Sequence, residues 1–185
     1  MSVTAQSVGL AAERLAGVVI ETPLQFNQRL SAATGAQVWL KREDLQPVRS
    51  YKLRGAYNLI AQLSGAERAA GVACASARNH GQGVAYACAR LGIRAQIFVP
   101  STTPRQKRQR MRQLGEGWAE LIVHGDTYDD AAALAHEVVA SEGRTLVPAF
   151  DDERTIAGQG TVAAEIVAQL GRAPDTLIVP VGGGG

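Results

Sequence analysis

The chain has 185 residues, 46% of them hydrophobic and 19% charged, a composition typical of a globular protein that buries its core without metals or disulfides. Its formal net charge of +2 is too small to predict nucleic acid as a partner. It has no apolar run of about 20 residues, and its first residues, with Glu13 and Arg14, do not resemble a signal sequence, so no membrane association is expected. Cys74 and Cys88 lie in apolar segments and are expected to be buried free thiols, which favours a cytoplasmic protein.

Helical and extended patterns alternate along the chain. Apolar spacing predicts a first helix over residues 5–17, and alternation predicts a strand over 37–43. The next expected helix is 50–64, with Ser50 as a candidate N-cap. The later expected strands are 71–76, 95–100, 119–125, 145–150 and 175–185, and the later expected helices are 79–92, 103–115, 128–142 and 155–171. This order predicts an α/β fold in which helices cover both faces of a parallel sheet, giving three αβα layers.

The last expected strand runs into a glycine-rich segment. Gly182, Gly183, Gly184 and Gly185 follow it directly. Glycines at the carboxyl end of a parallel strand let backbone N–H groups turn toward an anion such as phosphate, although a flexible tail is the alternative. Because a helix normally follows such a loop in an α/β protein, we expect the chain to be the N-terminal piece of a longer protein.

The loop SARNHGQG, residues 76–83, follows the buried strand 71–76. Ser76 and Asn79 are placed to hydrogen-bond a ligand at the carboxyl edge of the sheet, which is the usual binding edge. Capping of the next helix by Asn79 is the alternative. His80 is a candidate base, although a histidine with a structural hydrogen bond is the commoner case.

Lysine is scarce in this chain. Lys41, Lys52 and Lys107 are the only lysines among 19 basic residues, so the other 16 are arginines. Lys52 follows Ser50 and Tyr51 at the expected start of a helix. An arginine stays protonated, whereas a partly buried lysine can lose its proton and attack a carbonyl. The alternative is an ordinary surface lysine.

Other motifs carry less weight. The stretch GQGTVA, residues 158–163, matches a dinucleotide-binding pattern but has no strand directly before it, so we interpret its glycines as allowing close helix packing. The basic run 105–112 is expected to be a solvated helix face. Metal-ligand spacing of cysteine and histidine is absent from the sequence, as is a G-x-S-x-G nucleophile motif.

Four stretches occur in an order that resembles a known family: KREDLQPVRSYKLRGAYN, SARNHGQG, AGQGT and VPVGGGG. Together they resemble the biosynthetic threonine dehydratases (threonine ammonia-lyases), pyridoxal-phosphate enzymes of the tryptophan-synthase β-like fold, also called fold type II. Serine dehydratases and serine racemases are near relatives of these enzymes. The resemblance extends from about residue 11 to residue 185.

The resemblance implies roles for particular residues. Lys52 would form the Schiff base with pyridoxal 5′-phosphate and remove the Cα proton of threonine, giving 2-oxobutanoate and ammonia as products. Tyr51, where the family usually has phenylalanine, would lie beside the cofactor ring, and Asn79 would hydrogen-bond the cofactor's 3′-oxygen. The remaining contacts would be Gly182, Gly183, Gly184 and Gly185 to the cofactor phosphate, and Ser76, Ala77, Arg78, Asn79 and His80 to the substrate carboxylate.

The resemblance also implies two domains with the active site between them. The small domain would span residues 48–145, and residues 1–47 and 146–185 would form part of a large cofactor domain that is incomplete here. A homo-oligomer is expected for the longer protein. The family's group that meets the pyridine nitrogen is expected beyond residue 185.

Two residues depart from the family pattern. Arg78 stands where the asparagine loop usually has glycine, so it is expected to strain the loop, to crowd the carboxylate site or to point outward. Ala149 stands where many relatives have proline. The nearest enzyme alternative is a serine dehydratase or racemase, and the alternative of another class is a remnant, made inert by truncation and Arg78, that binds an anion or a partner.

Overall fold

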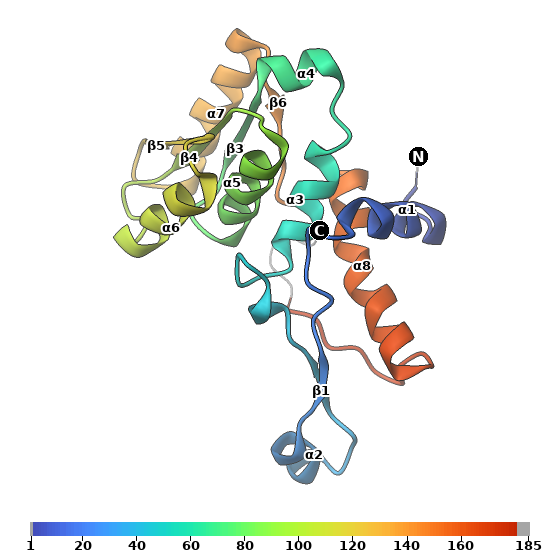
Figure 1. The fold of residues 1–185 in the computed structure, drawn as a ribbon. Coiled ribbons are helices and arrows are strands. Elements are labelled where there is room, and N and C mark those ends of the chain that lie inside the picture. Colours follow the sequence, from blue (N-terminus) through green and yellow to red (C-terminus); the bar gives the residue numbers. More distant parts are fainter. Residues whose placement is uncertain (1, 181–185) are drawn as a thin grey trace.

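The computed structural model describes residues 2–180, and its centre is a parallel four-stranded sheet (Figure 1). The strands stand in the order β5-β4-β3-β6, and every neighbouring pair is parallel. Their bounds are β3 Val72–Ala75, β4 Ala95–Val99, β5 Ala119–Val123 and β6 Thr145–Leu146. Four of the predicted strands are thereby confirmed, although β6 is shorter than the predicted 145–150. One further ladder bond joins Val147 N to Ala73 O, and Pro148 then has no N–H to continue the ladder.

Helices cover both faces of this sheet, which confirms the predicted α/β class and its three layers (Figure 1). On one face lie α5 (Asn79–Leu91) and α6 (Arg105–Gly115), which pack on Cys74 and Ile97. On the other face α7 (Tyr128–Glu142) packs on Ala73 and Phe98. Adjacent residues of the two central strands β3 and β4 therefore point to opposite faces, and Ala73, Cys74, Ile97 and Phe98 are all buried, as in a doubly covered parallel sheet.

The predicted helix 50–64 is shorter in the structure, where α3 runs over Lys52–Ile60. A separate short helix that was not predicted, α4 over Gly65–Ala70, follows it. Ser64 and Glu67 form the capping box that starts α4. The N-cap of α3 is Tyr51 rather than the predicted Ser50.

Two further helices were predicted close to their observed bounds. The first is α1, Ala5–Leu15, predicted over 5–17. The second is α8, Glu153–Leu170, predicted over 155–171. Among residues 2–180, no helix has the length and apolar composition needed to cross a bilayer.

A small antiparallel hairpin projects from the body of the molecule (Figure 1). It pairs β1 (Leu24–Phe26) with β2 (Trp39–Lys41), and α2 (Gln28–Thr34) lies between the two strands in sequence. A 3-10 turn over Glu43–Leu45 follows. The sequence predicted the second strand, as part of 37–43, but neither β1 nor α2.

The predicted strand 175–185 is wrong in its described part. Residues 176–180 form no ladder, and Ile178 is 89% exposed. A strand exists only where a neighbour takes its backbone hydrogen bonds, and none of the described strands lies beside this segment. The predicted phosphate loop, Gly182 to Gly185, lies outside the described residues.

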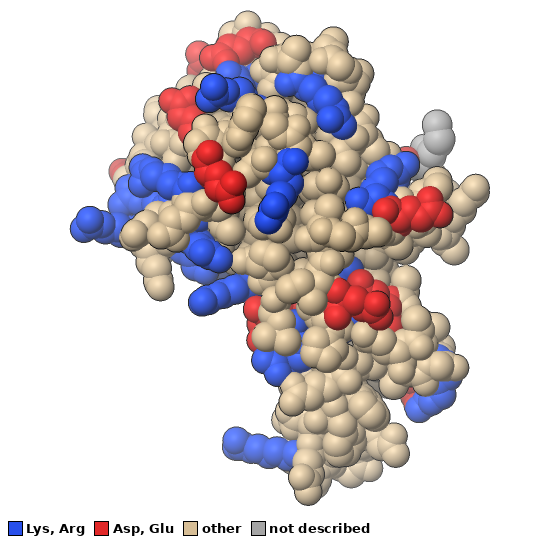
Figure 2. Space-filling model, viewed as in Figure 1, with Lys and Arg blue, Asp and Glu red and all other residues tan. Residues whose placement is uncertain are grey.

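The basic run on α6 is a solvated face, as predicted. Its buried side chains are Met111 and Leu114, whereas Arg105, Lys107 and Arg112 are exposed. Figure 2 shows basic side chains gathered on the side of the molecule where α6 lies. Arg110 reaches back from this helix to donate to the Pro47 carbonyl at 3.0 Å.

Helix α3 lies between α5 and α8, and a glycine allows each close approach. A Cβ on Gly158 of α8 would lie 2.6 Å from the carbonyl oxygen of Arg54 and 2.7 Å from the Cα of Gly55. A Cβ on Gly83 of α5 would lie 3.0 Å from the carbonyl oxygen of Lys52. The interpretation of the GQGTVA glycines as close-packing residues is confirmed at Gly158.

We expect Gly158→Ala to destabilise the protein, because its methyl group must displace the backbone of α3. The expected loss in the free energy of unfolding, measured by urea denaturation, is about 1–3 kcal/mol. Gly9→Ala is the matched control, since Gly9 also lies inside a helix but has no atom within 4 Å of the place that an added methyl group would take. That change should be neutral or raise stability by up to about 1 kcal/mol. Equal effects of the two changes on the free energy of unfolding would contradict the close contact between α8 and α3 at Gly158.

Candidate functional site

Lys52 is the first residue of α3 and points toward the segment that follows β6. Its Nζ donates a hydrogen bond to the carbonyl oxygen of Ala149 at 2.9 Å and lies 5.2 Å from the centre of the Tyr51 ring. The side chain is half-buried, and this burial lowers the pKa of Lys52 below its ordinary value. Ser50 Oγ accepts from the backbone N–H of Lys52 at 3.2 Å and so holds the start of the helix. A fully exposed surface lysine would not have its pKa lowered by burial.

The loop after β3 is held by Ser76 rather than by Asn79. Ser76 Oγ accepts from the backbone N–H groups of Arg78 at 3.3 Å and Gly81 at 3.0 Å. The N-cap position of α5 is Arg78, so the alternative that Asn79 caps this helix is wrong. Among the described residues, the Asn79 side chain has no hydrogen-bond partner.

Arg78 does not adopt the left-handed conformation that favours glycine. Its φ is −137°, so the strain expected from a residue other than glycine at this position is wrong. The side chain is exposed, which agrees with the outward-pointing alternative, and Ala77 beside it is half-buried.

His80 is a buried neutral histidine. Its Nε2 lies 2.8 Å from the carbonyl oxygen of Val147, and since a carbonyl only accepts, Nε2 must carry the proton and donate. The pKa of His80 is lowered to about 4: burial is the largest cause, the hydrogen bond to Val147 partly opposes it, and the nearby charge of Lys52 adds to the lowering. Nδ1 is buried and has no hydrogen-bond partner among the described residues. His80 thus has a structural hydrogen bond on one nitrogen and a free acceptor on the other.

The segment 147–149 brings these groups together. It receives the His80 hydrogen bond at Val147 and the Lys52 hydrogen bond at Ala149. Because it follows β6, and the 76–80 loop follows the adjacent β3, both lie at the carboxyl edge of the sheet. Lys52 and His80 therefore meet at the edge where the sequence predicted a ligand site.

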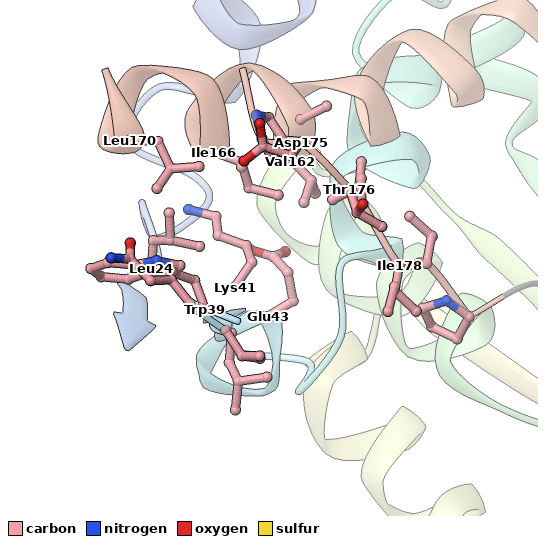
Figure 3. A pocket seen from close by; sticks show the side chains of 18 of the residues that line it. Leu24, Trp39, Lys41, Glu43, Val162, Ile166, Leu170, Asp175, Thr176 and Ile178 are labelled. Atoms are coloured by element: carbon pink, nitrogen blue, oxygen red, sulfur yellow. The ribbon is translucent and has the colours of Figure 1, made fainter. Parts of the chain in front are cut away.

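A cavity of about 1400 Å³ opens beside Lys52 (Figure 3). Tyr51, Lys52 and Gln159 form part of its wall. Figure 3 shows side chains of the hairpin and of α8 facing each other across it, among them Trp39 and Ile166. The cavity wall is mostly apolar, with charged side chains at Lys52 and also at Lys41, Glu43, Arg172 and Asp175.

Sequence reasoning missed Gln159 in this wall. Its Oε1 accepts from the backbone N–H of Gly55 at 3.2 Å and so satisfies the first turn of α3, while its Nε2 is buried without a partner among the described residues. The AGQGT stretch was the available signal, but its glycines alone were interpreted.

These features define a class of protein. A parallel α/β sheet presents a half-buried lysine amine, next to an aromatic ring, at its carboxyl edge and beside a large cavity. The family model described as "Pyridoxal-phosphate dependent enzyme" matches residues 15–185, and the chain belongs to this family. The cofactor of the family is pyridoxal phosphate.

Similar proteins narrow the class further. The chain is 60% identical over 184 residues to the L-threonine dehydratase biosynthetic IlvA of Mycobacterium tuberculosis, covering 100% of this chain and 43% of that protein. The processed threonine deaminase isoform 2 of Solanum lycopersicum matches with a TM-score of 0.80 and 39% identity, over 91% of this chain and 50% of that one. Maize serine racemase matches with a TM-score of 0.87 and 28% identity, over 92% and 51%. The chain thus spans less than half the length of the mycobacterial relative.

The residues present fit the family's cofactor. Formation of a covalent bond with its aldehyde requires an amine that can lose its proton, and Lys52 has a lowered pKa. The cavity beside it has room for an aromatic ring next to Tyr51. Lys52 and Tyr51 are the residues of its wall that would meet this group.

His80 should make the protein less stable in acid. In the unfolded chain a histidine binds a proton near pH 6.5, whereas folded His80 does so only at about 4. The unfolded state therefore binds more protons between these values, and the free energy of unfolding falls as pH drops through this window, by up to about 1.4 kcal/mol per unit. His80→Gln, which can still donate to Val147 but does not titrate, should lose this part of the slope in urea denaturation. An unchanged slope would contradict a buried neutral His80.

Proposed function

We propose that this chain is the lysine-bearing part of a pyridoxal-phosphate-dependent threonine dehydratase, which converts L-threonine to 2-oxobutanoate and ammonia. The observation that carries the proposal is Lys52, half-buried at the sheet edge with its amine on the Ala149 carbonyl. The 60% identity to a biosynthetic threonine dehydratase supports the same assignment, and it favours isoleucine biosynthesis as the pathway.

Lys52 would attach the cofactor and then move a proton. The bound cofactor would supply an electron sink for the Cα carbanion of the substrate. Proton removal needs a neutral amine, and a lysine with the ordinary pKa of about 10.4 is almost fully protonated at pH 7. The burial that lowers the pKa of Lys52 therefore increases the reactive fraction.

The loop 76–80 would bind the substrate carboxylate at the start of α5. Ser76 engages two of the N–H groups there, and the backbone N–H groups of Asn79 and His80 have no intrahelical partner. An anion at a helix N-terminus is stabilised by such groups and by the helix dipole. We assign the Asn79 amide to the cofactor ring. The phosphate contacts of Gly182 to Gly185 stay a prediction.

The organisation of the whole protein follows from the same likeness. We propose a small domain over residues 48–145 and a large domain that includes 1–47 and 146–185. We also propose that the enzyme is a cytoplasmic homo-oligomer. These assignments rest on the family pattern rather than on a contact of the described residues.

A serine racemase is the second candidate, because the maize serine racemase superposes with a TM-score of 0.87. Racemisation needs a second acid–base group on the face of the substrate opposite the lysine. His80 does not suit this role, since its protonated nitrogen is held by Val147 and its pKa is lowered to about 4. Dehydration is therefore favoured over racemisation.

Attachment of the cofactor can be measured on this chain. We expect pyridoxal phosphate followed by borohydride reduction to label Lys52, detected by mass spectrometry of its peptide. The chain has three lysines, so Lys52→Arg and Lys107→Arg form a matched pair. The first variant should lose at least about nine tenths of the label, and the second, which changes an exposed lysine, should keep it. Labelling spread evenly over the three lysines would contradict the assignment and favour an inactive remnant.

Catalysis can be measured in a chimera in which residues 1–185 replace the matching part of the mycobacterial relative. We expect the chimera to release ammonia and 2-oxobutanoate from L-threonine, and Lys52→Ala to reduce kcat by at least about 10³, because no other group removes the Cα proton. Chiral chromatography of L-serine reactions distinguishes the alternatives. Formation of D-serine without release of pyruvate would favour the racemase.

A further inference from the structure

A buried ion network holds one side of the first turn of α3. Arg54, which has no exposed surface, donates to both carboxylate oxygens of Glu43 at 2.8 and 2.9 Å and to both of Glu165 at 2.6 and 2.9 Å. It also donates to Thr161 Oγ1 at 3.1 Å. Lys41 Nζ lies 2.6 Å from Glu165. We call these five residues the Arg54 network; its two cations balance its two carboxylates.

The Arg54 network joins three parts of the fold. Glu43 begins the turn after β2, and Glu165 lies on α8, 111 residues from Arg54 in the chain. Thr22 Oγ1 adds a hydrogen bond to Glu43 at 2.6 Å, which ties in the segment before β1. The orientation of α3 is thereby fixed against α8 and against the chain on either side of the hairpin.

Arg54 and Lys52 leave α3 in opposite directions. A helix turns about 100° per residue, so side chains two residues apart point about 200° apart around the axis. Arg54 accordingly meets α8, while Lys52 meets the Ala149 carbonyl after β6. Because the first turn of α3 is rigid, a shift at the Arg54 side must move the Lys52 side.

We infer that the Arg54 network is a positioning device for the Lys52 amine. It fixes the first turn of α3 from behind and so keeps Nζ on the Ala149 carbonyl, half-buried in the cavity wall. The guanidinium suits this task because its planar fork binds two carboxylates with two hydrogen bonds each, which an ammonium group cannot do. The inference rests on the proposed function only in one respect, namely the catalytic role that the proposed function assigns to Lys52.

Two single-charge changes distinguish positioning from plain electrostatics. Arg54→Gln removes a positive charge and Glu165→Gln a negative one, so Coulomb effects alone would shift the pKa of Lys52 in opposite directions. Loosening of the first turn of α3 lets water reach the amine in both variants and raises its pKa in both. Neutral His80, the Tyr51 ring and the Ala149 carbonyl lie next to Lys52, and neither variant changes them. The charged side chains of Lys41 and Glu43 line the same cavity, and they too are kept in both variants.

The pKa of Lys52 can be read in the 185-residue chain without cofactor. Reductive methylation with ¹³C-formaldehyde gives one NMR signal for each of the three lysines and one for the N-terminal amine, and exposed Lys107 serves as an internal reference during a pH titration. We expect both variants to raise the pKa of Lys52 by about half a unit or more, toward the free value of about 10.4. Shifts of opposite sign, or unchanged values in folded variants, would overturn the inference.

Two further variants keep the test decisive. Thr161→Val removes one hydrogen bond to Arg54 without a change of charge, and it should raise the pKa of Lys52 by a smaller amount even if Arg54→Gln does not fold. No shift in either Thr161→Val or Glu165→Gln would overturn the inference. Phe98→Leu weakens the core on the opposite face of the sheet and should leave Lys52 unchanged; an equal shift there would mean that the network only stabilises the fold. Failure of cofactor labelling would not alter these titrations.

Discussion

The buried charge of Arg54 is the constraint on which the rest of the arrangement depends. An ionised side chain without solvent contact is tolerated only when opposite charges and hydrogen bonds surround it, and removal of one partner typically costs about 3–5 kcal/mol. Burial would raise the pKa of Glu43, but hydrogen bonds from Arg54 and Thr22 outweigh it and hold that pKa below its ordinary value. Glu43 and Glu165 must therefore converge on Arg54, which fixes α3 relative to α8.

The glycines at the two helix contacts of α3 fix a second property of this helix, its distance from its neighbours. Gly158 lets α8 approach from one side, and Gly83 lets α5 approach from the other. The ion network sets the orientation of the helix, and the glycines set its distance from its neighbours. A nine-residue helix would be marginal alone, so its geometry comes from these contacts rather than from its own propensity. The ion network and the glycine contacts together determine the position of Lys52 at the sheet edge.

Local sequence patterns predicted much of this fold. The elements that they predicted wrongly or missed depend on pairing with segments elsewhere in the chain. The central strands and their helices follow from apolar runs and periodicity, because both faces of the sheet are covered. The strand β1 has three residues and exists through pairing with β2, with Leu24 opposite Lys41, which no local pattern reveals. The segment 176–180 shows the converse, since its apolar residues resemble a strand but have no strand partner among the described residues.

The candidate reactive residues of the site were easier to predict than the buried residues that hold them in position. The scarcity of lysine singled out Lys52, and polar residues after a buried strand singled out the 76–80 loop. Arg54 is one of sixteen arginines, and nothing local distinguishes a buried one. Its partner Glu165 follows 111 residues later, so the pairing becomes visible only when the chain is folded.

The reactivity of Lys52 depends on how dry its surroundings are. Burial is the cause of its lowered pKa, and the neighbouring histidine is neutral, so the amine has no cation beside it to add to the effect. Apolar Leu177, Ile178 and Val179 line the same cavity and are themselves exposed. An uncharged group that fills that cavity removes water from both the apolar wall and the lysine stem. Occupancy of the cavity by such a group and neutrality of the amine are therefore linked, and each favours the other.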